Sequence, residues 1–257
     1  MQVDGIGLAR MEFMISNHIK IHSMALVHPE IVSSEDQVRK IRKLTMSYAD
    51  LIEYFVDRLE SRIAIISASQ YPKPVIVRTS DFKTNEYAGL IGGSVFEPRE
   101  ENPMLGWRGA SRYYSGAYRE GFELEWKALK KVREEIGLDN LIIMIPFCRT
   151  LKESEKVLEV ISGFGLNRGE NGLQDYMMCE IHSNYILAEQ FAIYFDGFSV
   201  GSNDLTQLIL GVDRDSRSMA HLFDENDPAV KKAIREVIKH AHRADIKIGF
   251  CGQAPQQ

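Results

Sequence analysis

The sequence predicts an α/β fold with a parallel sheet, and a (β/α)8 barrel is the architecture that fits best. Short apolar runs rich in β-branched residues alternate with longer amphipathic segments along the 257 residues. This alternation is typical of a parallel sheet with right-handed crossovers, and the length suits one barrel. No repeat, low-complexity tract or proline-rich linker divides the chain, so we expect residues 1–257 to form a single domain.

Seven segments are expected to form strands, because each is short, apolar and set between polar stretches. They are residues 5–8, 75–78, 104–107, 141–145, 177–180, 197–200 and 246–251. A (β/α)8 barrel needs an eighth strand and helix, and the seventh strand lies close to Gln257. We therefore expect a barrel that is truncated before its eighth strand and helix. An open, doubly wound sheet is the alternative.

Five longer segments are expected to form helices that cover the sheet. They are residues 34–59, 120–136, 151–163, 184–194 and 229–244. In the first, apolar residues such as Val38, Ile41 and Leu44 recur at helical spacing. The last follows Asp227 and Pro228, a pair in which the aspartate caps a helix and the proline occupies its first position.

The composition excludes several kinds of function. The formal net charge of -5 gives no overall basic field that would attract nucleic acid or an anionic membrane. The chain has no apolar run of about 18 residues and no signal-peptide pattern, so we expect a soluble, cytoplasmic protein. Cys148, Cys179 and Cys251 are too widely spaced for a zinc pair or a disulfide framework, and the histidines lack the spacing of a zinc site.

Charged and reactive residues follow the predicted strands at their carboxyl ends, the edge at which parallel α/β folds build their sites. Two of them are carboxylates, Glu180 after the fifth predicted strand and Asp204 after the sixth. Mg²⁺ prefers oxygen ligands and usually takes one or two carboxylates from the protein. A Mg²⁺ site is one interpretation of this pair, and an ion pair between Glu180 and a neighbouring arginine is the other.

Arginines accompany these carboxylates at the predicted strand ends. They are Arg10, Arg78, Arg108 and Arg214. A guanidinium group stays charged and binds carboxylate or phosphate through two parallel hydrogen bonds, so arginines around a metal indicate a site for a small anion. Any one of them could instead form an ordinary ion pair, which is the interpretation we adopt for Arg112 and Arg168.

Cys251 ends the last predicted strand, beside Gly252 and Gln253. A thiol there could donate a proton to a substrate carbon or accept one from it, because a thiol pKa lies near enough to neutral. The alternative is a small buried hydrophobic residue. Cys179 is expected to pack in the core, because neighbouring residues of a strand face opposite sides and Glu180 faces the site.

The same residues lie in long stretches that resemble the PEP-utilising enzyme family. The stretches are GIGLARMEFM, VIVRTSDFKTNEYAGLIGG, FEPREENPMLGWRGASRYY, IMIPFCRT, GLNRGENGLQDYMMCEI, FDGFSVGSNDLTQLILGVDRDS and GFCGQAP, and they cover nearly the whole chain in order. The resemblance implies a (β/α)8 barrel of the phosphoenolpyruvate/pyruvate-binding type, with its site at the carboxyl ends of the strands. It also implies a homodimer.

The resemblance implies roles for individual residues. Glu180 and Asp204 match the family's Mg²⁺ ligands, and Cys251 matches the residue that protonates or deprotonates the substrate's methyl or methylene carbon. The residues that match its substrate-binding groups are Arg10, Arg78, Arg108, Asn203 and Arg214. The implied reaction is that of a phosphotransferase with paired acceptors, in which a phosphoryl group passes from a phosphohistidine to the enolate of pyruvate and gives phosphoenolpyruvate.

The chain departs from the family pattern in two ways. The family's proline after Glu180 and Ile181 is His182 here, and the sequence leaves the role of His182 open. The family's ATP-binding domain and its phosphohistidine domain have no counterpart in this chain, so we expect both as partners from the full-length enzyme. Two other functions stay open: a lyase that handles pyruvate or phosphoenolpyruvate on a similar barrel, and a non-catalytic fragment.

Overall fold

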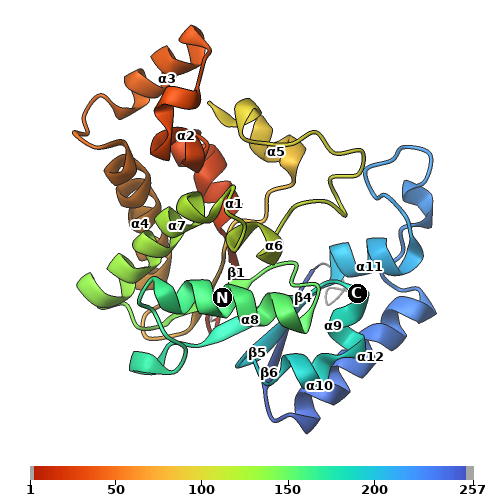
Figure 1. Cartoon of the computed structure of the whole chain (residues 1–257). Coiled ribbons are helices and arrows are strands. Elements are labelled where there is room, and N and C mark those ends of the chain that lie inside the picture. The colour runs from red at the N-terminus through yellow and green to blue at the C-terminus, as the bar shows by residue number, and fades with distance from the viewer. Residues whose placement is uncertain (1–2, 253–257) are drawn as a thin grey trace.

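Six parallel strands form one sheet at the centre of the computed structural model, which describes residues 3–252 (Figure 1). In chain order, which is also their order in the sheet, the strands are β1 (Ile6–Arg10), β2 (Val75–Arg78), β3 (Leu141–Ile145), β4 (Asp175–Cys179), β5 (Gly197–Gly201) and β6 (Lys247–Cys251). Each strand pairs with the next in parallel register, and such pairs need a crossover segment between them. The predicted α/β class is confirmed.

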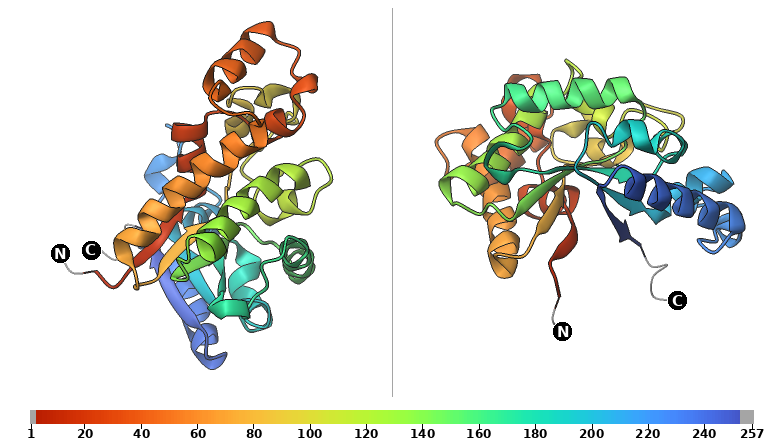
Figure 2. Two further views of the ribbon diagram at one scale, coloured as in Figure 1. Left: turned by 90° about the vertical axis from the view of Figure 1, so that its left-hand side faces the viewer. Right: turned by 90° about the horizontal axis from the view of Figure 1, so that it is seen from below.

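The sheet is curled, with β1 and β6 as its two outer strands (Figure 2, right). The Sγ atom of Cys251 on β6 lies 3.6 Å from the carbonyl oxygen of Gly7 on β1, although the two strands share no ladder. The inner face has its own small apolar cluster, distinct from the main core. Its members are Ile142, Met144, Tyr176 and Met178, packed against Leu8, Ile76 and Cys251. Residues 3–252 thus form a curled half-barrel.

Helices cover the outer face of this half-barrel and the carboxyl ends of its strands. They are α1 (Met11–Met14), α2 (Ser23–Val27), α3 (Glu35–Thr45), α4 (Leu51–Gln70), α5 (Thr84–Ala88), α6 (Ala110–Tyr113), α7 (Arg119–Lys130), α8 (Leu151–Gly163), α9 (His182–Ile186), α10 (Ala188–Phe191), α11 (Ser202–Leu210) and α12 (Pro228–Arg243). Figure 1 shows α2, α3 and α5 standing beyond the carboxyl ends of the strands, and α12 packs against β5 and β6. No helix within residues 3–252 is long and apolar enough to span a membrane.

Most predicted elements are confirmed. Six of the seven predicted strands are present, and those at residues 75–78 and 141–145 have the predicted bounds. The predicted cap of the last helix is also present, because Asp227 Oδ1 accepts from Ala229 N at 2.7 Å and Pro228 begins α12. The two strands are marked by continuous apolar runs, and the helix is marked by its capping residues.

The predicted strand at residues 104–107 is wrong. This segment lies in the loop between β2 and β3, where Gly106 N donates to Pro103 O in a turn. Trp107 N donates to Glu100 Oε1 at 2.9 Å rather than to a neighbouring strand. Proline and glycine favour turns, and they keep this short apolar run from extending into the sheet.

Two predicted helices are each divided. Residues 34–59 contain α3 and the first part of α4, because Asp50 begins a new helix by accepting from Ile52 N at 2.9 Å. Residues 184–194 are divided between α9 and α10 at Leu187, whose backbone leaves helical geometry with ψ of 28°. Apolar periodicity continues across both breaks, so it cannot locate them.

Arg112 and Arg168 form ion pairs, as the sequence interpretation expects. Arg168 Nη2 lies 2.9 Å from Asp196 Oδ1 near the surface. Arg112 is instead fully buried, where its two terminal nitrogens hold both oxygens of Glu97 at 2.5 and 2.7 Å. Its guanidinium also lies 4.1 Å from the centre of the Trp107 ring. A buried charge needs partners of this kind.

Asp175 is a buried carboxylate without such partners. It begins β4 at the amino end of the sheet, is fully buried, and neither of its carboxylate oxygens has a hydrogen-bond partner. Burial, together with the nearby Asp196 carboxylate, raises the pKa of Asp175 from 3.8 to about 7. The folded chain therefore keeps a proton that the unfolded chain loses, and stability should fall as the pH rises from about 4 to about 7.

We expect Asp175→Asn to remove the loss of stability that ionisation of Asp175 causes as the pH rises from about 4 to about 7. The free energy of unfolding should increase by ~1–3 kcal/mol at pH 8 and by clearly less at pH 5, because the parent side chain is already neutral in the folded state at the lower pH. Urea unfolding at the two pH values measures this difference. An equal effect at both values would contradict ionisation as its cause.

Candidate active site

The carboxyl ends of the strands border a cavity of about 520 Å³. It is lined by all eight residues selected from the sequence: Arg10, Arg78, Arg108, Glu180, Asn203, Asp204, Arg214 and Cys251. The carboxyl ends of parallel strands meet at one edge of a sheet, which explains why residues so far apart in the chain lie together. His182 begins α9 beside Tyr185 and is not among the residues that line the cavity.

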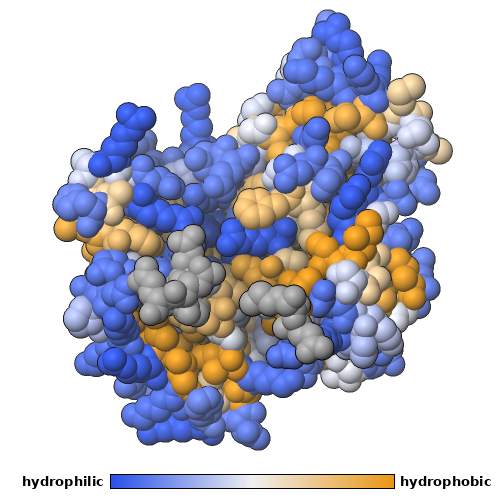
Figure 3. Space-filling model, turned by 180° about the vertical axis from the view of Figure 1, so that it is seen from behind, coloured by the Kyte–Doolittle hydropathy of each residue, from blue (hydrophilic) through white to orange (hydrophobic). Residues whose placement is uncertain are grey.

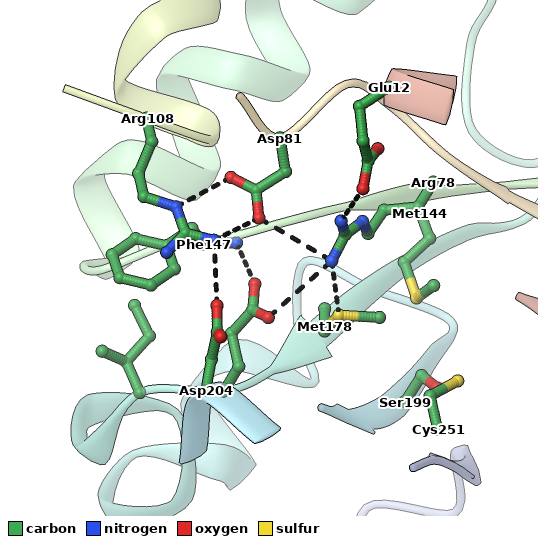
Figure 4. A network of polar contacts seen from close by, with 12 residues as sticks. Glu12, Arg78, Asp81, Arg108, Met144, Phe147, Met178, Ser199, Asp204 and Cys251 are labelled. Atoms are coloured by element: carbon green, nitrogen blue, oxygen red, sulfur yellow. Dashed lines mark hydrogen bonds and ion pairs between the residues drawn. The ribbon is translucent and has the colours of Figure 1, made fainter. Parts of the chain in front are cut away.

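Three carboxylates form an acidic cluster in this cavity. Asp81, Glu180 and Asp204 each offer an oxygen, and these oxygens lie within 4.8 Å of one another. Asp81 lies in the loop after β2, Glu180 directly follows β4, and Asp204 lies in the first turn of α11 after β5. Figure 4 shows Asp81 and Asp204 pointing toward the same guanidinium group.

The backbone of a neighbouring loop fixes Glu180. Glu180 Oε1 accepts from Phe147 N at 2.8 Å, and Asn184 Oδ1 accepts from Glu180 N at 3.2 Å. Phe147 has a positive φ of 47°. Gly109 lies so close that a Cβ atom added to it would come within 2.5 Å of the Phe147 Cβ. The Glu180 carboxylate is therefore held by a tightly packed turn rather than by a flexible side-chain contact.

Arg108 binds two members of the acidic cluster. It forms a two-pronged pair with Asp81, with Nε 3.0 Å from Oδ1 and Nη2 2.5 Å from Oδ2. Arg108 Nη2 also donates to Asp204 Oδ2 at 2.9 Å. The guanidinium lies 4.1 Å from the centre of the Phe147 ring, which fixes the plane in which it binds.

Arg78 binds the other side of the cluster (Figure 4). It forms an ion pair with Glu12, and its Nη1 atom lies 3.7 Å from Asp81 Oδ2 and 3.9 Å from Glu180 Oε2. The other oxygen of Glu12, Oε2, is buried and has no partner. Arg78 thus lies between three carboxylates, and one carboxylate oxygen beside it has no hydrogen-bond partner.

Electrostatics divide the carboxylates into two kinds. Burial would raise the pKa of Asp81, but the charges of Arg108 and Arg78 outweigh burial and lower its pKa to about 2. For Glu180, burial and then the charges of Asp204 and Asp81 raise the pKa to about 8. Near neutral pH, Asp81 is therefore a permanent anion, whereas Glu180 holds a proton until a further cation approaches.

The charges around Arg78 and Arg108 do not balance. Four carboxylates face these two guanidinium groups, so two negative charges remain when all four are ionised; the carboxylates are Glu12, Asp81, Glu180 and Asp204. A divalent cation carries the matching charge. Carboxylate oxygens this close together are also the ligands that Mg²⁺ prefers, so the donor set fits the predicted metal.

Asp81 and Glu12 were not selected from the sequence. Each follows a selected arginine closely, Asp81 three residues after Arg78 and Glu12 two residues after Arg10. A carboxylate so near a strand-end arginine is a usable signal, because both then lie at the same end of the same strand. An arginine partner was considered for Glu180 but not for Asp81 or Glu12, which bind Arg108 and Arg78.

Arg10 and Arg214 have no carboxylate partner among residues 3–252. The Arg10 guanidinium lies 5.3 Å from the centre of the Phe13 ring. With the Asn203 amide oriented to donate to Glu225 Oε1 at 3.0 Å, its oxygen accepts from Arg214 Nη1 at 3.3 Å. The cavity therefore contains two cations that are free to bind an anionic ligand.

Cys251 lines the cavity from the inner face of the curl. Its Sγ atom lies 2.9 Å from Ser199 Oγ, and Figure 4 shows these two side chains beside each other. Burial raises the pKa of the Cys251 thiol above its ordinary value, so the thiol form dominates at neutral pH. Cys179 is buried in the main core, as predicted, on the opposite face from Glu180.

Comparison with known proteins identifies the family. The sequence model described as "PEP-utilising enzyme, PEP-binding domain" matches residues 1–257. The chain belongs to this family. Its sequence resemblance to the PEP-utilising enzymes is thereby confirmed over the whole chain.

Curated members of the PEP-utilising family are much longer than this chain. Proteins named phosphoenolpyruvate synthase are 56% identical over 253 residues in Synechocystis sp., 54% over 252 residues in Pseudomonas aeruginosa and 51% over 253 residues in Escherichia coli. Each alignment covers 98% of this chain but only 31 or 32% of the relative. The chain therefore spans about a third of the length of the curated relatives it matches.

Because Glu180 holds a proton near neutral pH, a divalent cation that binds the three carboxylates must release it. We expect Mg²⁺ binding to release about one proton at pH 7, and the affinity should rise with pH until it levels off above the Glu180 pKa of about 8. Calorimetry in two buffers of different ionisation enthalpy counts the protons. Glu180→Gln should abolish the release, and pH-independent binding by the parent chain would contradict the assignment.

Proposed function

We propose that this chain binds pyruvate and phosphoenolpyruvate for a Mg²⁺-dependent phosphotransferase of the phosphoenolpyruvate synthase (pyruvate, water dikinase) type. A phosphohistidine on another domain would donate its phosphoryl group to the enolate oxygen of pyruvate. The observation that carries the proposal is the acidic cluster, which with Glu12 exceeds the charge of Arg78 and Arg108 by two when all four carboxylates are ionised. Arg10 and Arg214, which have no carboxylate partner among residues 3–252, line the same cavity. A divalent cation and a small dianion together satisfy that arrangement.

Glu180 and Asp204 are the residues we assign as Mg²⁺ ligands. Both carboxylates belong to the acidic cluster, and Glu180 is already fixed by Phe147 N at 2.8 Å. When bound, Mg²⁺ supplies a Lewis acid that stabilises negative charge on an enolate oxygen. Asp81 contributes to the same cluster, but its two-pronged pair with Arg108 favours a role in orienting that arginine.

The arginines are the groups we assign to the substrate anion, together with Asn203. Arg78 and Arg108 are held in place by Glu12 and Asp81, so they are oriented before a ligand arrives. Groups fixed in advance stabilise developing charge better than groups that must reorganise. Arg10 and Arg214 supply the charge that Glu12 and Asp81 do not neutralise. The set suits a carboxylate and a phosphoryl group on one small molecule.

Cys251 is the residue we assign to proton transfer at the substrate's methyl or methylene carbon. Its thiol enters the cavity from the inner face of the sheet, separate from the acidic cluster (Figure 4). The raised pKa favours the protonated thiol, which can donate to the carbon of an enolate. In the opposite direction the thiolate must accept a proton, and the Ser199 hydroxyl at 2.9 Å can donate to that thiolate.

The remaining parts of the enzyme are also proposals. We propose that the half-barrel is part of a (β/α)8 barrel within a single domain, and its support is the curl of the sheet and the unpaired edges of β1 and β6. The relatives are about three times longer than the chain, which supports ATP-binding and phosphohistidine domains as partners. A homodimer and a cytoplasmic location complete the proposal.

Oxalate, an analogue of the pyruvate enolate, tests the metal and the anion site together. We expect calorimetry to detect oxalate binding with Mg²⁺ present and at least about tenfold weaker binding without it, because Mg²⁺ offsets the negative charge of the acidic cluster beside the anion. Glu180→Ala should remove the Mg²⁺ dependence, whereas Asp175→Asn should keep it. Equal binding of oxalate by the parent chain with and without Mg²⁺ would refute the proposal.

The unpaired arginines provide a second test. Arg10→Ala and Arg214→Ala should each weaken phosphoenolpyruvate binding in Mg²⁺ by ~10–100-fold, the typical loss of a hydrogen bond between charged groups. Arg168→Ala is the matched control, since Arg168 pairs with Asp196 outside the cavity and its loss should leave the affinity unchanged. Similar affinities for all three variants would count against the assigned anion site.

A further inference from the structure

Ser80 lies between two residues of the candidate active site, and each of its polar groups is bonded. Ser80 N donates to Glu125 Oε2 at 3.0 Å, and Ser80 Oγ donates to Glu125 Oε1 in a short hydrogen bond. The carbonyl oxygen of Ser80 accepts from Tyr113 OH at 2.7 Å. Arg78 precedes Ser80 by two residues and Asp81 follows it. The loop after β2 is therefore clamped at its midpoint.

Glu125 is an unusual residue for the position it occupies. It lies in α7, has no exposed area, and forms no ion pair with a lysine, arginine or histidine among residues 3–252. Burial raises the pKa of Glu125 to about 7. A buried carboxylate without a cation is costly, and an apolar side chain could fill the space at lower cost. What the carboxylate provides is three acceptor contacts, two from Ser80 and one from Tyr118 OH at 3.1 Å.

The same carboxylate is connected through hydroxyl groups to α5, a helix with residues that line the cavity. Tyr118 OH lies 2.5 Å from Tyr87 OH, and Tyr87 OH lies 2.9 Å from Ser23 Oγ. Tyr87 belongs to α5, whose neighbouring residue Glu86 lines the cavity. The three side chains whose hydroxyl groups form this series, Ser23, Tyr87 and Tyr118, are all buried. Glu125 thus connects the loop that bears Arg78 and Asp81 to α5, the helix that follows this loop.

We propose that Glu125 is a positioning residue for the candidate active site, whose carboxylate fixes Ser80 and thereby the places of Arg78 and Asp81. The inference rests on the proposed function and deepens it. Glu125 does not line the cavity, so it acts only through the loop. Arg78 and Asp81 together bind Glu12 and Arg108. A shift of this loop would therefore move both guanidinium groups, and small displacements of that kind weaken ligand binding strongly.

Two substitutions and one control test the proposal. Glu125→Gln keeps the size of the side chain but removes its charge and one acceptor, and Ser80→Ala removes only the hydroxyl contact. Asp175→Asn is the matched control, a carboxylate-to-amide change in an equally buried side chain at the other end of the sheet. All measurements use the whole chain, well below the unfolding temperature of each variant, so that global stability does not enter the comparison.

Hydrogen exchange of the backbone amides at residues 79–81 is the first measurement, and it needs no ligand. Glu125→Gln should speed exchange there at least about tenfold, Ser80→Ala should speed it less, and Asp175→Asn should leave it unchanged. Unchanged exchange in Glu125→Gln would overturn the proposal. This result does not depend on whether the chain binds oxalate. The test of the Glu125–Ser80 contact is therefore separate from the test of the proposed function.

Oxalate binding in the presence of Mg²⁺ is the second measurement. The affinity should fall at least about tenfold in Glu125→Gln and by a smaller factor in Ser80→Ala, while Asp175→Asn binds as the parent chain does. Because the two variants weaken the same contact to different degrees, the affinity should follow the exchange rate at residues 79–81. Normal affinity in a variant whose loop exchanges faster would overturn the positioning role.

Discussion

A buried balance of charge at the carboxyl ends of the strands is the constraint on which the rest of the site depends. Carboxylates and guanidinium groups are held there largely out of water, where an uncompensated charge is expensive. Asp81 is central, because it contacts both Arg78 and Arg108. Its own charge is secured by these arginines, whereas the ionisation of Glu180 is opposed by its neighbours. Asp81 is therefore charged without any further cation, whereas Glu180 is not.

The scaffold separates this polar region from the two apolar ones. Alternation along β4 sends Met177 and Cys179 to the outer core, while Tyr176 and Met178 join the inner cluster. β4 also has a buried carboxylate at each end, Asp175 and Glu180. Burial raises the pKa of both, but only Glu180 has a carboxylate oxygen within 4.8 Å of oxygens from two other acids, Asp81 and Asp204. Burial at Asp175 therefore only lowers the stability of the fold. At Glu180 it keeps a proton on a carboxylate that lies beside two other acids in the cavity.

The sequence predicted the parts of the molecule that depend on local pattern. Strands with uniform β-branched runs were found with correct bounds, and the residues at strand ends converged because parallel strands share an edge. The segment 104–107 failed because an apolar run does not reveal that Pro103 and Gly106 turn the chain. Glu125 could not be predicted at all. It lies in the middle of an amphipathic helix, and its contact with Ser80 exists only once that helix packs.

The turn around Phe147 limits how this site can vary. Phe147 has a left-handed backbone that glycine would adopt more easily, yet its ring is stacked by Arg108 at 4.1 Å and by Arg149 at 4.7 Å. Gly109 must lack a side chain because Phe147 occupies the space. Phe147 is thus aromatic although its backbone conformation favours glycine, and Gly109 has no room for a side chain because Phe147 lies beside it. Drift at either position requires a simultaneous change at the other, so homologous chains should inherit the two as a unit.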